Sequence, residues 1–344
     1  MSPSLPRRST QEPAAQVRLF DRRPKPADLR AEVLHGLSLP RKALPPKLFY
    51  DREGSRLFDA ITELPEYYPT RTEIGILRAH GPAMAEQVGP GRTLIELGSG
   101  SSLKIQILLA ALAPALYVPV DISRDHLLAS AKALARRFPG LQIDAVCADY
   151  SAPFDLPLDR GAPPPAAFFP GSSIGNFEPA QAWEFLARIG RLVGAGGCLL
   201  MGVDLVKDRT RLEAAYNDAQ GVTAAFNRNL LARLNRELGA NFVLHTFEHL
   251  AFFNPSPDPR LADGPGRIEM HLVSTRAQQV QIEGCVFSFR DGETIHTESS
   301  YKYDLPGFAR LAAEAGFTTE QVWTDAQSLF SVHCLRSGLP SSGE

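Results

Sequence analysis

The sequence lacks the features that would direct a chain to a membrane, to nucleic acid or to an oxidising compartment. Its 344 residues carry a formal net charge of −2, so no basic surface for nucleic acid or anionic lipid is expected. The four cysteines are far apart, and small buried thiols in a reducing cytosol are the favoured interpretation. The most apolar run, residues 106–120, contains Pro114 and Pro119 and is too short to cross a bilayer. We therefore expect a soluble, cytoplasmic protein that binds neither membranes nor nucleic acid.

The first 25 residues also lack the apolar core of a signal peptide, and their richness in proline, arginine and serine predicts a mobile tail. Further along, residues 92–206 alternate between short apolar runs and helical periodicity. Alternation of this length predicts βαβ units. The fold class is therefore α/β, with a Rossmann-like, doubly wound and mostly parallel sheet.

A change in the pattern of apolar residues after residue 206 predicts a second, smaller α+β domain. A polar helical block and then strand-like alternation occupy residues 207–301, and the helices of residues 26–71 are expected to complete this domain. The end of the chain reads as helix, strand, strand and is expected to return to the first sheet. The first domain is thus assigned residues 72–206 plus 302–338, and the second residues 26–71 plus 207–301.

The turn in "TLIELGSGSS" lacks the third glycine of a dinucleotide fingerprint, because Leu103 stands at that position. Glu96 would also repel a pyrophosphate there. S-adenosylmethionine (SAM) has no phosphate and carries a sulfonium and an ammonium, so an acid at the strand end suits it. Gly98 and Gly100 would let the backbone approach this ligand closely.

Two further acids follow the next two expected strands. Asp121 ends "YVPVD" and is placed to accept hydrogen bonds from both ribose hydroxyls of SAM. Asp149 in "VCADY" can accept from the adenine amino group, with Tyr150 against the ring. Three acids at three successive strand ends favour a SAM site over solvated turns.

With these residues in place, the chain resembles the histidine Nα-methyltransferases of ergothioneine biosynthesis over residues 39–335. The resemblance rests on "LFYDREGSRLFDAITELPEYYPTRTE", "ELGSGSS", "YVPVDIS", "GSSIGNF", "GVDLVKD", "AAYNDAQGVTAAFNRNLL", "RIEMHL" and "TESSYKY". It implies a SAM-dependent enzyme that places three methyl groups on the α-amine of L-histidine to give hercynine. We expect a monomer that uses no metal.

The resemblance also implies roles for individual residues. They are Tyr50 near the amine, Tyr67 in the pocket wall, Asn176 and Tyr216 at the carboxylate, Met270 beside the ring, Glu298 and Ser300 facing the imidazole, and Gly98 and Lys104 at the cofactor. Of these, Tyr50 is the candidate catalytic residue. Ser299 and Tyr301 depart from the family pattern, which expects apolar or small residues there.

Alternatives remain open. A methyltransferase of the same fold could act on another amine, such as an indole amino acid, although Glu298 and Met270 argue against it. A catalytically silent protein could bind SAM or histidine and regulate a partner. A nicotinamide-dependent oxidoreductase is disfavoured by Leu103 and Glu96. His245 and His249 would share a helix face, but without a third ligand they do not predict a metal site.

Overall fold

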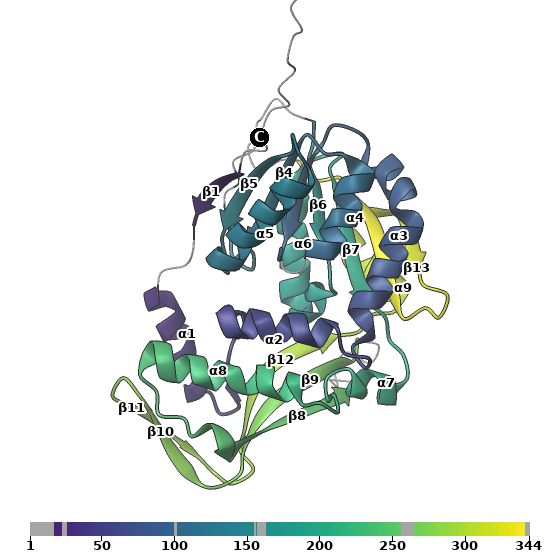
Figure 1. Cartoon of the computed structure of the whole chain (residues 1–344). Helices are drawn as coiled ribbons and strands as arrows, with labels where there is room; N and C mark the ends of the chain where they lie inside the picture. The colour runs from purple at the N-terminus through teal and green to yellow at the C-terminus, as the bar shows by residue number, and fades with distance from the viewer. Residues whose placement is uncertain are drawn as a thin grey trace, which may run out of the picture.

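The protein is built on two main β-sheets, a larger one and a smaller one that lies below it in Figure 1. The computed structural model describes residues 17–22, 26–99, 102–154, 156, 163–255 and 265–340. Within these residues the larger sheet has eight strands in the order β1-β5-β4-β3-β6-β7-β14-β13. The smaller has four in the order β2-β12-β9-β8, and β10 and β11 form a separate hairpin.

The larger sheet is parallel from β1 to β7, and β14 and β13 extend it with antiparallel pairing. Its strands are β1 (Val17–Asp21), β3 (Thr93–Leu97), β4 (Leu116–Asp121), β5 (Gln142–Cys147), β6 (Ala166–Phe169), β7 (Cys198–Asp204), β13 (Phe317–Thr324) and β14 (Phe330–Ser337). Every residue of β3, β6 and β7 is buried, as expected for strands covered on both faces. The predicted doubly wound α/β fold is confirmed.

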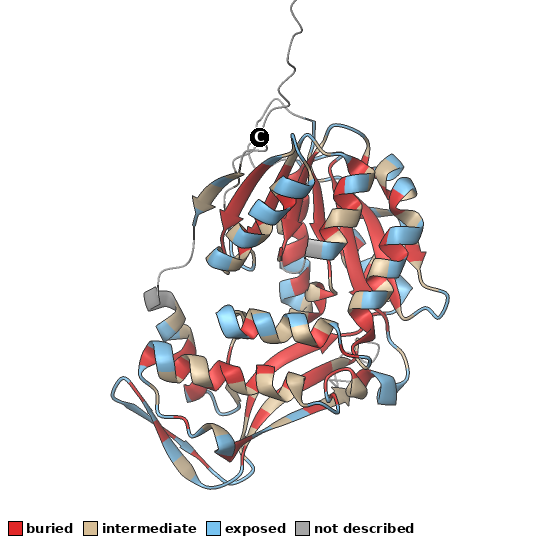
Figure 2. Ribbon diagram, in the orientation of Figure 1, coloured by how far each residue is buried: buried red, intermediate tan, exposed pale blue. Residues whose placement is uncertain are grey.

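Helices cover both faces of this sheet, so that its strands form the buried layer in Figure 2. α3 (Tyr68–Val88), α4 (Ser102–Leu112) and α5 (Arg124–Arg137) share one apolar cluster with the sheet. α6 (Pro179–Val193) and α9 (Leu305–Glu314) share another cluster on the opposite face. No helix of the described chain is both long and apolar enough to cross a membrane.

The smaller sheet packs one face against helices. Its strands are β2 (Lys42–Ala43), β8 (Phe247–Asn254), β9 (Arg267–Ser274) and β12 (Thr294–Tyr301), and the hairpin is β10 (Gln278–Ile282) with β11 (Cys285–Phe289). The remaining elements are α1 (Pro26–Ser38), α2 (Arg52–Thr62), α7 (Arg209–Ala214), α8 (Val222–Leu238) and the 3₁₀ turns η1 (Pro46–Phe49), η2 (Ser173–Asn176) and η3 (Leu244–Thr246). Alternate residues of β9 and several of α8 belong to one buried apolar cluster, which forms the core of this half.

The expectation of a mobile tail over residues 1–25 is wrong for Val17–Asp21. These residues form β1, an edge strand that pairs in parallel with β5. Val17 and Leu19 pack on the core, and Arg18 forms an ion pair with the buried Asp144 at 2.5 Å. The apolar alternation of this short segment therefore adds a strand; residues 1–16 and 23–25 lie outside the described residues.

A helix around His245 and His249 is also not observed. His245 lies in η3, whereas His249 lies in β8 and its ring contacts Asn227 and the carbonyl of Tyr216. Alternate side chains of β8 face the core of the smaller sheet, and this packing outweighs the helical spacing in the sequence. The four-residue spacing therefore does not bring the two histidines to one helix face.

Candidate active site

The turn after β3 begins at Gly98, where the backbone has a left-handed φ that favours glycine. Its φ is +74°, and a Cβ at this position would lie 3.4 Å from the ring of Tyr150. The amides of Gly98 and Ser99 both donate to the carbonyl of Val120, at 2.9 and 3.2 Å, which ties the turn to the end of β4. Gly100 lies outside the described residues. The ring of Tyr150 thus lies directly against the start of the turn.

Glu96 is enclosed in the sheet just before this turn. Its side chain is buried, and the hydroxyl of Tyr117 on β4 donates to its carboxylate. Burial raises the pKa of Glu96 to about 8, which the Tyr117 hydrogen bond and the charge of Lys104 offset only in part. Contact between Glu96 and the positive charge of a cofactor stays a prediction.

Asp121 and Asp149 lie at the carboxyl ends of β4 and β5, where ligands of such sheets bind. Asp121 accepts a hydrogen bond of 2.7 Å from the amide of Ser123, and burial raises the pKa of its carboxyl. Burial also acts to raise the pKa of Asp149, but hydrogen bonds from Ser151 and the charge of Lys47 lower it overall. Because Lys47 Nζ reaches Asp149 at 3.0 Å from η1, the strand ends face the helices of the smaller half.

Lys104 anchors the loop that follows β6. Its Nζ lies 2.6 Å from the carboxylate of Glu73, which is fully buried on α3. The same carboxylate accepts from the amide of Gly171 at 2.9 Å. Lys104 therefore joins α4 to α3 and, through Glu73, to the loop that carries Asn176.

The tyrosines expected around the substrate form a row of edge-to-face rings. Tyr50 contacts Phe58 at 5.8 Å between ring centroids, Phe58 contacts Tyr67 at 6.3 Å, and Tyr67 contacts Tyr216 at 6.3 Å. Burial raises the pKa of Tyr50 well above its ordinary value, and the nearby Glu298 adds to this effect. Tyr50 is therefore a neutral hydroxyl at physiological pH, at one end of this row of aromatic rings.

A β-bulge turns Glu298 toward this row. β12 pairs with β9 so that His296 lies opposite His271 and Glu298 opposite Met270, with a register shift between the two pairs. The extra residue, Thr297, donates to Asn227 on α8 at 2.8 Å, so it faces the helix side of the sheet. Without the bulge, strict alternation would direct Glu298 to the other face.

The carboxylate of Glu298 accepts no hydrogen bond from the described residues, and its oxygen atoms are not fully enclosed although the residue is only 8% exposed. Burial raises the pKa of Glu298 to about 7, and the charge of Lys302 offsets this only in part. An uncompensated buried carboxylate is costly, and a ligand that brings an N–H donor would remove the cost. Glu298 also raises the pKa values of Tyr50, Tyr67 and Tyr216, which places all three rings in its electrostatic field.

Asn176 ends η2, in a loop that lies directly on β12. A Cβ at Gly175 would come within 2.7 Å of the carbonyl oxygen of Tyr301, so glycine permits this close approach. Ser172, in the same loop, has a left-handed φ of +58°, and its hydroxyl accepts from the amide of Asp204 at 2.9 Å. The loop thereby holds the half-buried Asn176 beside the end of β12 that carries Ser300.

Tyr216 and Ser300, expected at opposite ends of the substrate, are in contact with each other. The Tyr216 hydroxyl donates to Ser300 Oγ at 2.8 Å. Sequence reasoning missed the two charged residues behind this pair, Lys302 and Asp204, although both stand in the motifs "TESSYKY" and "GVDLVKD". Lys302 lies two residues after Ser300 on an extended segment, and that spacing was an available signal.

One group of possible metal ligands lies on the outer face of the smaller sheet. Ligand atoms of Glu269, His271 and His296 lie within 4.8 Å of one another. Glu269 and His271 alternate with the core residue Met270 and so face away from Glu298. The Glu269 carboxylate already accepts from Arg267 at 2.9 Å and from Asn254 at 3.0 Å.

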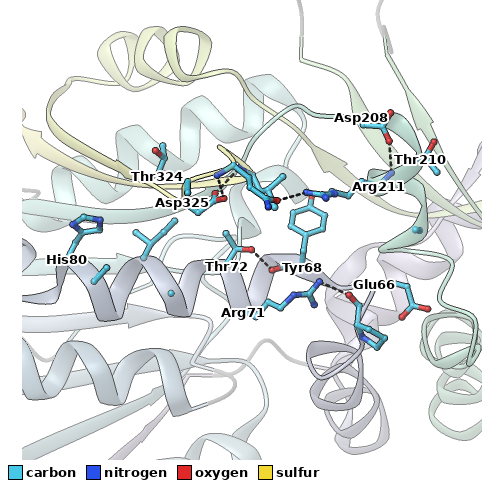
Figure 3. A pocket seen from close by; sticks show the side chains of 18 residues that line it. Glu66, Tyr68, Arg71, Thr72, His80, Asp208, Thr210, Arg211, Thr324 and Asp325 are labelled. Carbon is cyan, nitrogen blue, oxygen red and sulfur yellow. Dashed lines mark hydrogen bonds between the residues drawn. The ribbon is translucent and has the colours of Figure 1, made fainter.

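A cavity of about 1030 Å³ lies between α3, α7 and the turn from β13 to β14 (Figure 3). None of the expected site residues lines it. Its two arginines are held by neighbouring groups: Arg71 donates to the carbonyls of Leu64 and Pro65, and Arg211 donates to Gln327 at 3.1 Å. The candidate active site therefore lies elsewhere, between the carboxyl ends of β3 to β5 and the inner face of β9 and β12.

These features define the class of protein. A mostly parallel Rossmann-like sheet, with a glycine turn after one strand and acids after the next two, is the architecture of a SAM-dependent methyltransferase. The cation of SAM suits a turn that follows the buried Glu96 and lies beside the strand ends of Asp121 and Asp149. The chain belongs to the family described as histidine-specific, SAM-dependent methyltransferases, whose model matches residues 29–337.

Relatives of known name agree with this family. A histidine N-alpha-methyltransferase of Mycolicibacterium smegmatis is 43% identical over 310 residues, covering 88% of this chain and 93% of the relative. A protein of the same name from Mycobacterium tuberculosis is 41% identical with the same coverage. Ergothioneine biosynthesis protein 1 of Neurospora crassa is 31% identical over 82% of this chain, which spans 32% of that longer protein.

Proposed function

We propose that this enzyme transfers three methyl groups from SAM to the α-amine of L-histidine and so forms hercynine. The observation that carries this proposal is Glu298, a buried carboxylate that no described residue supplies with a donor and whose pKa is raised to about 7. The N–H of an imidazole supplies the missing donor, whereas an apolar side chain would leave the carboxylate unpaired. Met270, directly opposite Glu298 in the strand pairing, would pack against the ring.

The tyrosine row would enclose the amine. A neutral Tyr50 hydroxyl can hold the amine by a hydrogen bond, while the rings of Tyr50, Tyr67 and Tyr216 accommodate the growing cation by cation–π attraction of ~0.5–2 kcal/mol. Before each transfer the ammonium loses one proton to water. The nitrogen lone pair then forms the new N–C bond while the S–CH3 bond of SAM breaks, and the electron pair of that bond stays on the sulfur of S-adenosylhomocysteine. After three transfers no N–H remains, so the aromatic faces are the groups left to bind the product.

The cofactor half would hold SAM, which supplies the methyl group as an electrophilic sulfonium substituent. Asp121 would accept from the ribose hydroxyls and Asp149 from the adenine amine, with Tyr150 against the ring. Glu96 would complement the positive charge, Gly98 and Gly100 would give the backbone access, and Lys104 would hold the loop of Asn176. Asn176 would bind the carboxylate of histidine, and in this arrangement positioning supplies most of the rate enhancement.

We further propose that the larger sheet with its helices is the SAM-binding domain and the smaller sheet with α1, α2 and α8 the substrate domain. The enzyme would act as a cytoplasmic monomer without a metal. Size-exclusion chromatography with light scattering tests the oligomeric state, and activity after treatment with a chelator tests the metal.

The reaction is tested by mass spectrometry of products from L-histidine and SAM. We expect histidine with one, two and finally three added methyl groups, all on the α-nitrogen. A ring-methylated product would overturn the orientation of the substrate. L-tryptophan serves as the comparison substrate, and faster turnover of tryptophan than histidine would favour an enzyme for indole amines. Binding of SAM and histidine without any product would favour the silent regulator.

A further inference from the structure

Lys302 is buried behind the two hydroxyls that face the expected substrate. It directly follows β12, and its side chain is inaccessible to solvent. Its ammonium donates to Ser300 Oγ at 2.8 Å and to Tyr216 OH at 3.0 Å. The third contact is an ion pair of 2.8 Å with the carboxylate of Asp204 at the end of β7. All three ammonium donors are thus engaged.

The surroundings hold this lysine in its charged form. Burial alone would lower the pKa of Lys302, but the charge of Asp204 and the neighbouring Tyr216 raise it overall. Burial likewise acts to raise the pKa of Asp204, whereas the charges of Lys302 and Lys207 lower it. Both partners are therefore ionised at physiological pH, and a fixed positive charge lies behind Ser300 and Tyr216.

This charge determines which hydrogen bond Ser300 can still form. A serine hydroxyl has two acceptor lone pairs and one hydrogen. One lone pair of Ser300 accepts from Tyr216 OH at 2.8 Å and the other from Lys302 Nζ at 2.8 Å. Only the hydrogen of Ser300 remains, and the cationic donor polarises the hydroxyl so that this hydrogen is a stronger donor.

We propose that Lys302 is a positioning residue that makes Ser300 an obligatory donor, so that Ser300 and Glu298 together read a neutral imidazole in one tautomer. This inference rests on the proposed function. Glu298 accepts from the ring N–H, and Ser300 donates to the ring nitrogen that carries no hydrogen. A protonated imidazolium presents a second N–H to the Ser300 hydrogen and to the charge of Lys302, so the site rejects it. Asp204 has the supporting role of holding Lys302 charged.

Lys207 provides a matched control. It is also nearly buried, and it also pairs with Asp204, while its Nζ contacts Tyr68 OH at 2.6 Å instead of Ser300. Lys302→Met and Lys207→Met therefore each remove one cation from Asp204. Only the first removes a donor to Ser300. Asp204 keeps Tyr68 and one lysine as partners in either variant.

The first experiment measures the binding of L-histidine by calorimetry in the presence of S-adenosylhomocysteine. We expect Lys302→Met to lower the affinity for histidine at least tenfold and Lys207→Met to lower it no more than about twofold. The affinity for the cofactor should be unchanged in both variants. In a Ser300→Ala background, the Lys302→Met effect should shrink to less than about threefold, because the residue through which it acts is gone. Equal losses for the two lysine variants, or an undiminished loss in the Ser300→Ala background, would overturn the proposal.

A second measurement uses only the parent enzyme, so its outcome does not depend on whether a variant folds. The ¹⁵N spectrum of ring-labelled histidine bound to the parent enzyme reports the protonation of both ring nitrogens. At about pH 7.5, above the ordinary imidazole pKa, we expect one protonated and one bare nitrogen in a single tautomer. A bound imidazolium, or a mixture of tautomers, would contradict the role given to Lys302. A parent enzyme that does not bind or methylate histidine at all would instead contradict the proposed function.

Discussion

Glu298 lies directly opposite Met270 in the pairing of β12 with β9, immediately after the register shift that follows His296. This pairing puts a carboxylate on the apolar inner face of the sheet, where its pKa rises to about 7 through burial. Its counterpart on the outer face is Glu269, which is equally buried at 8% exposure but is paired with Arg267. The two glutamates therefore have similar burial and opposite electrostatic environments.

This difference predicts opposite pH effects on stability. The folded-state pKa of Glu298 is raised from 4.5 to about 7, so the folded protein loses stability as pH rises through that window. Glu298→Gln should stabilise the ligand-free protein above about pH 7, by up to roughly 3 kcal/mol at 1.36 kcal/mol per pKa unit, and should change little near pH 4. Urea denaturation of both proteins across this pH range measures the effect.

Glu269→Gln is the contrasting variant for this measurement. The hydrogen bond with His271 is the largest of the interactions that lower the pKa of Glu269, so its carboxylate stabilises the fold above the ordinary glutamate pKa. Glu269→Gln should therefore destabilise the protein at neutral pH, with the difference vanishing as pH falls. A loss of stability in Glu298→Gln at pH 8 would contradict an uncompensated charge at Glu298.

Asp121→Ala should weaken SAM binding without greatly changing histidine affinity. The carboxylate of Asp121 would accept hydrogen bonds from the ribose hydroxyls, and loss of hydrogen bonds to a charged group costs ~1.5–3 kcal/mol. Calorimetric titration with SAM measures the change. An unchanged SAM affinity would contradict the proposal that Asp121 binds the ribose, but it would not bear on the fold.

Gly98→Ala tests whether the turn itself contacts the cofactor, and Gly91→Ala is its control. Both glycines have a left-handed φ, +74° and +69°, so each substitution should cost about 1 kcal/mol of stability. A Cβ at Gly98 meets the ring of Tyr150 at 3.4 Å, whereas a Cβ at Gly91 meets nothing within 4 Å. We expect SAM affinity to fall about tenfold only in Gly98→Ala, which is 1.4 kcal/mol. Equal SAM affinities in the two variants would argue against a cofactor at this turn.

Local pattern was sufficient for the larger sheet except its edge strand β1, and it was insufficient for the details of the smaller sheet. The apolar run ending at Leu97 and the glycine turn after it predict a buried strand and its loop, because both signals are local. The bulge at Thr297 depends on a hydrogen bond to Asn227, 70 residues away in the sequence, and no local rule contains it. β8 carries apolar residues at spacings that also fit a helix, and its pairing with β9 decides the outcome.

Some site residues could likewise be predicted from the local sequence, whereas some of their contacts could not. Acids after strands could be named from the sequence, since strand ends of a parallel sheet gather at one edge. The spacing of Lys302 from Ser300 was a local signal, but its pairing with Asp204 could not be named from the sequence. Lys302 follows β12 of the smaller sheet, whereas Asp204 ends β7 of the larger one, and the two meet only in the folded protein.

The most direct test of the central claim is kcat/KM for L-histidine in the parent, Glu298→Ala and Glu269→Ala. Loss of a charge-assisted hydrogen bond to the ring should cost Glu298→Ala about 2–3 kcal/mol of transition-state stabilisation, a fall of roughly 30- to 150-fold. Glu269→Ala removes an equally buried glutamate from the other face of the same strands, and its kcat/KM should stay within about threefold of the parent. A Glu298→Ala value within about twofold of the parent would contradict the claim that this carboxylate recognises the imidazole ring.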